Sequence, residues 1–170
     1  RLGGGLEVYV TTLVVNDALF AGNSATDSVG GLLSWNSTLT LTNAVSRGNR
    51  SASGPGGGIG IWNGTATLTN VTIAGNQGST NGGLNSTGTL SVRNTIVAGN
   101  SGNEVGITAG SATFHYSLVE GGCPTSATCD HSIFGDPLFV NPVDPATAPT
   151  TAGDVSLLPA SPALDAGANP

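Results

Sequence analysis

The sequence is unusually poor in charge. Charged residues make up 8% of its 170 residues, no lysine is present, and the formal net charge is −6; average proteins carry about a quarter charged residues. The shortage of basic residues excludes nucleic acid as a partner, because binding it requires clustered Lys and Arg that release counterions. The acidic excess lies at one end, since residues 123–170 contain five Asp and no basic residue.

Long hydrophobic runs are also absent. No apolar segment approaches the roughly 20 residues of a membrane-spanning helix, so we expect no membrane span in this chain. No signal peptide is visible, which indicates a mature chain or a fragment. Methionine is absent, aromatic residues make up 5%, and glycine is abundant, with 27 residues. Small polar residues in place of charged ones favour short strands joined by tight turns.

Cysteine is limited to Cys123 and Cys129, six positions apart. A metal site would need a closer Cys spacing and a second pair of ligands, which His131 alone does not supply. The spacing predicts a small disulfide-closed loop, which would place the protein in an oxidising, extracytoplasmic compartment. Two free thiols are the alternative.

Two short motifs recur together about 25 residues apart. One is Gly-Gly followed by an aliphatic residue; the other is Asn or Asp, four variable residues, then Gly-Asn. The first motif starts at Gly4, Gly30, Gly57 and Gly82, with an echo at Val105-Gly106-Ile107; the second ends at Asn23, Asn49, Asn76 and Asn100, with a degenerate copy at 116–122. A fixed period in the twenties is the signature of a solenoid.

Each repeat contains three short segments with a strand period of two, separated by turn residues. In residues 57–76, for example, Ile59 and Ile61 alternate with Gly60 and Trp62 before the turn dipeptide Asn63-Gly64. Three strands and three corners per coil predict an all-β, pectin-lyase-like, right-handed parallel β-helix. We expect about five coils over residues 1–122, stacked about 4.8 Å apart.

Stacking turns each repeat position into a column. We expect a core column of Val15, Leu41, Leu68, Val92 and Phe114, and two inward-facing structural ladders. The first ladder is Asp17, Asn43, Asn70 and Asn94, followed by Tyr116; the second is Asn23, Asn49, Asn76 and Asn100. Asn suits a ladder because its amide donates to one coil and accepts from the next.

The periodicity stops near Gly122, and eight of the nine prolines lie in residues 123–170. We therefore expect an acidic, Pro-rich tail with short strands at 136–140 and 155–158, which caps the last coil or docks beside the stack. An open coil edge invites polymerisation. The first coil has no such cap, so preceding coils or another chain must cover it.

These motifs resemble a known group. Gly-Gly-aliphatic paired with Phe-x-x-Asn, complete here as Phe20-Ala21-Gly22-Asn23, resembles the repeat of bacterial polymorphic outer-membrane-type β-helix proteins. Segments 135–140 and 158–167 resemble the tail of secreted "choice-of-anchor" β-helix proteins. The resemblance covers nearly the whole chain and implies the β-helix fold. Its members include surface adhesins and structural proteins.

The same architecture also hosts polysaccharide lyases and hydrolases, which need paired acidic residues. The acids of the repeats are Glu7, Asp17, Asp27, Glu104 and Glu120, and the columns place no two side by side. His115 and His131 have no acidic neighbour in register. We therefore expect no catalytic residues, no cofactor and no enzyme activity, since the fold alone does not imply function.

Tyr9, Trp35 and Trp62 occupy one outward position of three successive coils. A row of rings could stack on sugars or form an apolar seam for another subunit. Alternatively, the tail or a neighbouring corner covers them within the same chain. All three interpretations remain open.

Two further sites are weaker. Asp136, Asp144 or Asp154 could hold Ca²⁺, although calcium takes six to eight oxygen ligands, and a solvated surface is the alternative. Sequons occur at Asn36, Asn49, Asn63, Asn70 and Asn85. Asn49 and Asn70 are expected in the inward ladders, which would exclude a glycan there.

Together these patterns predict an extracellular or cell-surface, non-enzymatic protein with a structural or adhesive role. It would be a subunit of a surface filament or sheath, or an adhesin stalk, and would associate with itself or with cell-surface partners. The alternative is a carbohydrate-binding or polysaccharide-degrading β-helix protein, with glycans as partners.

Overall fold

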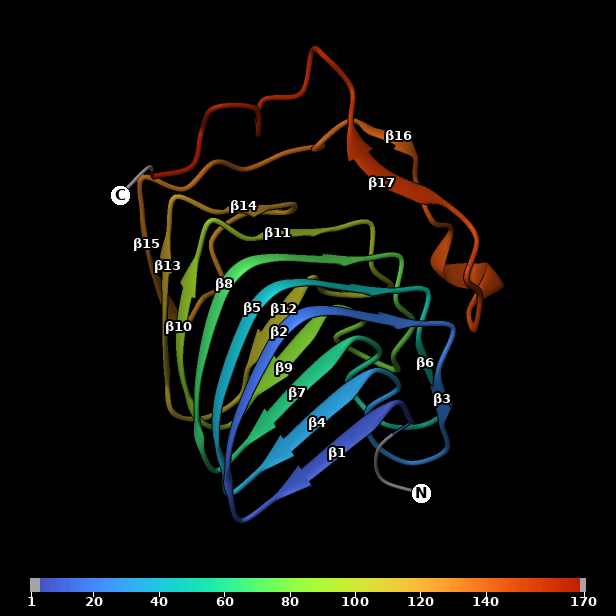
Figure 1. The fold of residues 1–170 in the computed structure, drawn as a ribbon, viewed down its shortest axis with the longest axis vertical. Coiled ribbons are helices and arrows are strands. Elements are labelled where there is room, and N and C mark those ends of the chain that lie inside the picture. The colour runs from blue at the N-terminus through green and yellow to red at the C-terminus, as the bar shows by residue number, and fades with distance from the viewer. Residues whose placement is uncertain (1–3, 169–170) are drawn as a thin grey trace.

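The computed structural model describes residues 4–168, and its fold is a parallel β-solenoid (Figure 1). This confirms the predicted β-helix class, with about four turns in place of about five coils. One face is a five-stranded sheet in which all neighbours are parallel. Its strands, in spatial order, are β1 (Leu6–Tyr9), β4 (Leu32–Trp35), β7 (Ile59–Trp62), β9 (Leu84–Ser86) and β12 (Val105–Ile107).

The second sheet wraps around a corner of the stack. Its strands are β2 (Thr12–Ala21), β5 (Thr38–Arg47), β8 (Thr65–Ala74), β10 (Thr89–Arg93), β11 (Ile96–Ala98), β13 (Ser111–His115), β14 (Leu118–Val119) and β15 (Ala127–Asp130). The three long strands bend in the middle, whereas later coils are split there into two short strands. A third side carries only β3 (Ser24–Ala25) paired with β6 (Arg50–Ser51).

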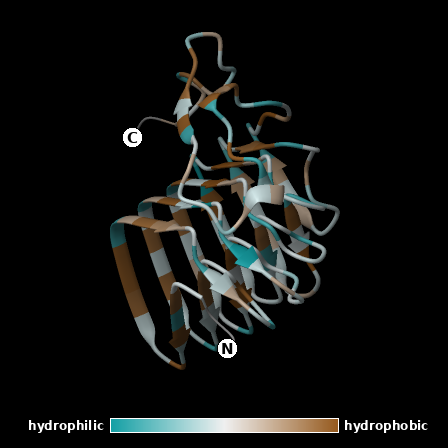
Figure 2. Ribbon diagram, turned by 90° about the vertical axis from the view of Figure 1, so that its right-hand side faces the viewer, coloured by the Kyte–Doolittle hydropathy of each residue, from teal (hydrophilic) through white to brown (hydrophobic). Residues whose placement is uncertain are grey.

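The core follows from the alternation of apolar and small polar residues along each strand, visible as brown and pale bands in Figure 2. The predicted core column is in register from β2 through β5, β8 and β10 to β13. Leu41, Leu68, Val92 and Phe114 are fully buried. Val15, in the first coil, is only partly buried because no described coil lies above it.

The second ladder is a buried chain of amides, as predicted. Asn23 donates its backbone N–H and its Nδ2 to Asn49 Oδ1, both at 2.9 Å. Asn49 donates in the same way to Asn76, at 3.0 and 2.9 Å, and Asn76 to Asn100, at 2.8 and 2.9 Å. Asn49 and Asn76 have no exposed surface. The ladder therefore satisfies polar groups that would otherwise be buried without partners.

The Gly-Gly motif makes room for this ladder. A Cβ on Gly58 would lie 2.7 Å from the Gly83 carbonyl oxygen and 2.9 Å from Asn76 Nδ2, and Gly31 and Gly83 are equally crowded. Any larger residue at these positions would collide with the next coil or with the ladder amide. The two motifs occur together in each repeat because the Gly-Gly pair packs against the ladder Asn.

The other predicted ladder faces outward, so its assignment as an inward ladder is wrong. Asp17, Asn43, Asn70 and Asn94 all have φ near +50°, and the first three are exposed. Asn tolerates this left-handed conformation better than most residues, which explains its choice at the corner where the long strands bend. Asn43 and Asn70 still donate to the preceding coil at 3.2 and 3.1 Å. The sequon at Asn70 is therefore accessible, whereas that at Asn49 is buried.

The tail both extends and flanks the stack (Figure 1). Strand β15 pairs with β13, and Ile133 bridges to Leu118, so the last coil is covered on this sheet. The chain then runs back along one side. Val143 packs on Gly75 and Thr150 on Gly48. Two strands, β16 (Phe139–Asn141) and β17 (Asp154–Leu157), pair antiparallel, with a 3-10 turn, η1 (Pro145–Thr147), between them.

The buried ladder predicts a sharp stability difference between two Asn columns. Asn76→Ala leaves the Asn49 N–H and amide without their acceptor in the core, and should lower the free energy of unfolding by about 3 kcal/mol or more. Asn70→Gly removes one exposed hydrogen bond and keeps the left-handed backbone, so its cost should be about 1 kcal/mol. Urea unfolding of both variants measures this. Equal losses would contradict the ladder's role.

Candidate functional site

The aromatic row is formed in register. Tyr9 pairs with Trp35 and Trp35 with Trp62 along the five-stranded sheet. Neighbouring rings meet edge to face, with centroids 5.8 and 5.3 Å apart. Tyr9 is 62% exposed, whereas the two Trp side chains are half-buried. Only the first ring therefore presents most of its surface to a partner.

A neighbouring corner contacts one of the two Trp side chains. The Asn36 amide, with its oxygen toward the indole, accepts from Trp35 Nε1 at 3.2 Å. The tail docks on Gly22, Gly48 and Gly75, at the far ends of the long strands from the aromatic row. The structure thus shows a corner contact at Trp35, whereas the buried Nε1 of Trp62 has no hydrogen-bond partner among the described residues.

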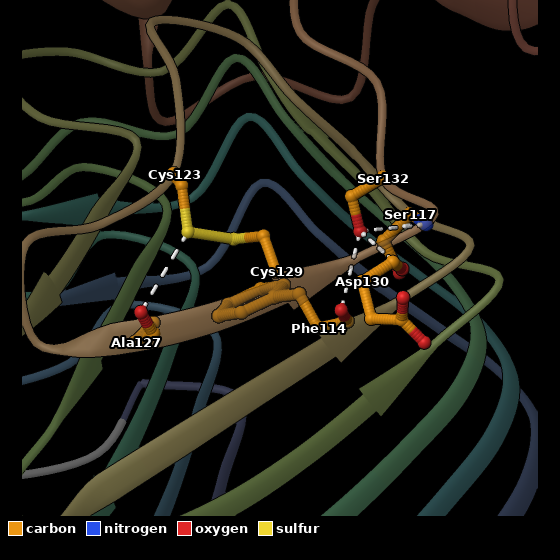
Figure 3. Close-up of a disulfide and its surroundings, with 7 residues drawn as sticks. All are labelled: Phe114, Ser117, Cys123, Ala127, Cys129, Asp130 and Ser132. Atoms are coloured by element: carbon orange, nitrogen blue, oxygen red, sulfur yellow. Dashed lines mark hydrogen bonds between the residues drawn. A yellow bond between two sulfur atoms is a disulfide. The ribbon is translucent and has the colours of Figure 1, made fainter.

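A recess lies at the C-terminal end of the stack. It is a cleft of about 610 Å³ between residues 102–108, which include β12, and the segment 119–126. The predicted disulfide between Cys123 and Cys129 is formed and ties this segment to β15. Figure 3 shows the disulfide beside Phe114, the last residue of the core column. The cleft is therefore walled by the last coil and a covalently closed loop.

Glu104 lines this cleft and ends the buried ladder. Its backbone carbonyl accepts from Leu84, so it occupies the place of the second Gly of the motif, one coil beyond Gly83. Its Oε1 accepts from Asn100 N at 2.9 Å and its Oε2 from Asn100 Nδ2 at 2.6 Å. Both side-chain oxygens are taken up as acceptors by Asn100, so the ladder stops here.

Burial raises the pKa of Glu104 from its ordinary value of 4.5 to about 7, against the opposing hydrogen bonds from Asn100. The negative charge of Glu120 adds to the rise. Near neutral pH this side chain is thus divided between a neutral acid and a carboxylate, the state that general acid–base chemistry requires.

Glu120 lies close by. Its Oε2 accepts from Gly99 N at 2.7 Å, and Gly99 directly precedes Asn100, which holds Glu104. The expectation that no two acids lie side by side is therefore wrong. The columns could not show the pair because Glu104 sits at a Gly position and Glu120 in the degenerate last copy of the repeat. Both deviations are visible in the sequence, but only the closing of the last coil brings them together.

A second cluster lies at the corner of the last coils. His115 is in register with Asp130, and their side chains are 3.3 Å apart; His131 Nδ1 lies 2.7 Å from the other Asp130 oxygen. The His131 ring stacks on Tyr116, with centroids 4.9 Å apart, and Arg93 lies over the same Tyr ring. The expectation that neither His has an acidic neighbour is wrong, because the partner strand β15 belongs to the tail, beyond the visible repeat.

The three candidate calcium ligands do not converge. Asp136, Asp144 and Asp154 each accept from the backbone N–H two residues further on. The pKa of exposed Asp154 is held below its usual range by the hydrogen bonds from Ser156. Within residues 4–168, no group of three or more His, Cys, Asp or Glu side chains is arranged to hold a metal ion.

Comparison with known proteins adds no relative. No protein-family model matches the chain, and neither the curated proteins nor the solved structures contain a significant match. The resemblance to polymorphic outer-membrane-type repeats thus rests on the motifs themselves. Across the part of the chain that the structure describes, no helix has the length and apolarity to cross a membrane.

The raised pKa of Glu104, at the end of the ladder, predicts that the stability of the fold depends on pH. A carboxyl whose pKa is higher in the folded than in the unfolded state stabilises the fold fully below about pH 4.5 and loses this contribution as the pH rises through 7. Glu104→Gln retains an oxygen acceptor for Asn100 and carries no charge. We expect its melting temperature, relative to the unmodified protein, to be higher at pH 8 than at pH 4.

Thermal unfolding of both proteins between pH 4 and 8 measures this difference. Groups remote from Glu104 titrate alike in the two proteins and cancel in the comparison. Parallel curves across the whole range would show that Glu104 carries no such proton.

Proposed function

We propose that this protein is an extracellular, non-enzymatic β-solenoid with a structural or adhesive role at a cell surface, in the manner of an adhesin stalk or a filament subunit. The observation that carries the proposal is the buried amide ladder, which runs through successive coils and supports a rigid stack. The recurring residues of the repeat have packing roles. Gly58 and its equivalents allow close contact between coils, and Asn76 and its equivalents form hydrogen bonds between coils. A rod of this kind presents long, regular faces to its surroundings.

The surface chemistry supports the same role. The outward positions of the long strands are mostly hydroxyl residues, with Thr38, Thr65 and Thr89 in register. Such faces are soluble without charge and offer few sites for proteases that cut at basic residues. The disulfide is the argument for an extracytoplasmic location, because such bonds persist in oxidising compartments.

The adhesive version predicts a glycan or surface partner at the aromatic row. Screening the purified protein on a glycan array tests it, with Tyr9→Ala and the double variant Trp35→Ala/Trp62→Ala as probes. We expect any binding to fall about tenfold or more when the rings are removed. Ser111→Ala, on the outer face of the last coil, is the matched control. Binding that survives loss of the rings would remove this row from the proposal.

One observation favours a second candidate, a polysaccharide-degrading protein. Glu104 and Glu120 are held on consecutive backbone amides beside a 610 Å³ cleft, and one of them has a pKa of about 7. A protonated carboxyl beside an ionised one is the arrangement that glycosidases use. Both oxygens of Glu104 already bind Asn100, however, which favours the structural assignment.

The two candidates differ in a simple assay. Incubation with a panel of neutral and acidic polysaccharides should release no reducing ends and no unsaturated sugars if the protein is structural. Release that disappears in Glu120→Gln, with the fold intact by circular dichroism, would establish the enzymatic candidate instead. Glu7→Gln, an exposed acid of the first coil, is the control for a general charge effect.

A further inference from the structure

The chain takes a shortcut through the last coil. Between β11 and β13 it uses twelve residues, 99–110, and these include β12. Between β14 and β15, at the equivalent place one coil later, it uses only seven, 120–126. All seven are described, and none of them forms a strand beside β12. The five-stranded sheet therefore ends one coil before the sheet that β15 extends.

The strand position that this shortcut skips is the cleft of about 610 Å³. Residues 102–108 and 119–126 form its walls. Gly121 and Gly122 line it, and a Cβ on either would meet no atom within 4 Å beyond its chain neighbours. The disulfide between Cys123 and Cys129 ties the shortcut loop to β15 (Figure 3). The cleft is therefore a preformed space with a covalently fixed wall.

The edge of β12 that borders this cleft has free backbone groups. Thr108 N donates to the Ser86 carbonyl at 2.9 Å, so the even-numbered residues of this segment face β9. Successive residues of a strand turn their N–H and C=O groups to opposite sides. Those of Val105 and Ile107 therefore point away from β9, and among residues 4–168 no strand pairs with them. Such an edge is a template for another strand.

The core beneath this edge is also incompletely covered. Val105 is buried in the core cluster, whereas Ile107 packs against it and is only partly buried. Their partners on β9, Leu84 and Ser86, have no exposed surface, and β12 is the strand that follows them in the sheet. A sixth strand with apolar residues at alternate positions would cover Ile107 in the same way.

The charges of the cleft indicate which strand would fit. Glu104 and Glu120 both line it, and the described residues of its lining include no Lys, Arg or His. Glu104 directly precedes β12 and Glu120 directly follows β14, so both acids belong to the start of the vacant strand position. A cationic side chain at this end of an incoming segment would complement them.

We propose that the cleft binds an extended segment of a partner protein, which adds to β12 as a parallel sixth strand and places a Lys or Arg side chain against Glu104 and Glu120. Hydrogen bonds to the backbone of Val105 and Ile107 provide affinity in this mode of recognition, and side-chain contacts provide specificity. The two acids would set the register of the bound segment.

The inference rests on the proposed non-enzymatic role and names a partner for it. The contact lies at the C-terminal end of the stack, in addition to any contact at the aromatic row. The enzymatic candidate would fill the same cleft with a polysaccharide, so the two candidates differ in what the cleft accepts.

Designed peptides test the proposal. The probe is a fluorescein-labelled, end-blocked peptide, Arg-Val-Thr-Ile-Thr, which follows residues 104–108 with Arg for the acid and Thr for the glycine. Fluorescence polarisation should show saturable binding to the unmodified protein. Exchanging the Arg for Glu should weaken binding by about tenfold or more, because it sets like charges against each other.

Methylation of single peptide nitrogens tests the strand pairing. In the proposed register the N–H of the central Thr faces β12, and methylating it should weaken binding by about tenfold or more. The N–H of the Val points away from β12, so methylating it is the matched control and should change binding little. Equal losses from both would contradict pairing with the edge of β12.

Variants of the protein give the complementary test. Glu120→Gln keeps an oxygen to accept from Gly99 N but removes the charge, and should weaken binding of the Arg peptide by about threefold or more. Glu7→Gln, on the far strand of the same sheet, should leave binding unchanged. Ile107→Pro removes an N–H that points into the cleft and should weaken binding by about tenfold or more. Circular dichroism checks that each variant is folded.

A benzophenone at the C-terminus of the peptide locates the site. Photo-crosslinking and mass spectrometry should mark residues 102–108 or 119–126. Crosslinks at the aromatic row, equal binding of the Arg and Glu peptides, or no binding at about 1 mM peptide would each overturn the proposal. Those results leave the structural role standing, whereas polysaccharide cleavage that is lost in Glu120→Gln would remove that role in a separate assay.

Discussion

The structure depends on one interaction, the buried hydrogen-bonded ladder of Asn23, Asn49, Asn76 and Asn100. In this stack of strands the chain turns at each corner of a coil, and the corner near the ladder buries backbone N–H groups that need an acceptor. The Asn side chain resolves this by accepting from the N–H and amide of the coil above while donating to carbonyls nearby. The second Gly of each Gly-Gly pair is the steric counterpart of that amide. The sequence period therefore arises because the same packing contact is repeated in every coil.

The two ends of the described ladder differ in their chemistry. At the C-terminal end Glu104 takes a glycine's place and ends the ladder, because both of its side-chain oxygens accept from Asn100. Its burial there is what lifts its pKa to about 7. At the other end of the described ladder, Asn23 donates its N–H and Nδ2 to Asn49.

The departures from the repeat carry more functional information than the repeat itself. Where the corner column changes from Asn94 to Tyr116 and His131, two bulky residues adopt a backbone conformation that favours Asn. Beside them Asp130 holds both His side chains. The outward positions of the middle coils are mostly hydroxyl side chains, with Asn at the corners and half-buried Trp rings. Ionisable side chains thus gather at the C-terminal end of the stack.

The sequence by itself determined the solenoid, the core column, the Asn23 ladder and the disulfide, because each depends on residues at a fixed spacing or close in the chain. It could not tell whether the Asn43 column faces in or out, since Asn suits both a buried ladder and a left-handed exposed corner. It also could not pair Glu104 with Glu120, or His115 with Asp130. Those contacts join the last coil to a loop and a tail strand outside the period, and their positions are decided only when the tertiary structure closes that end of the stack.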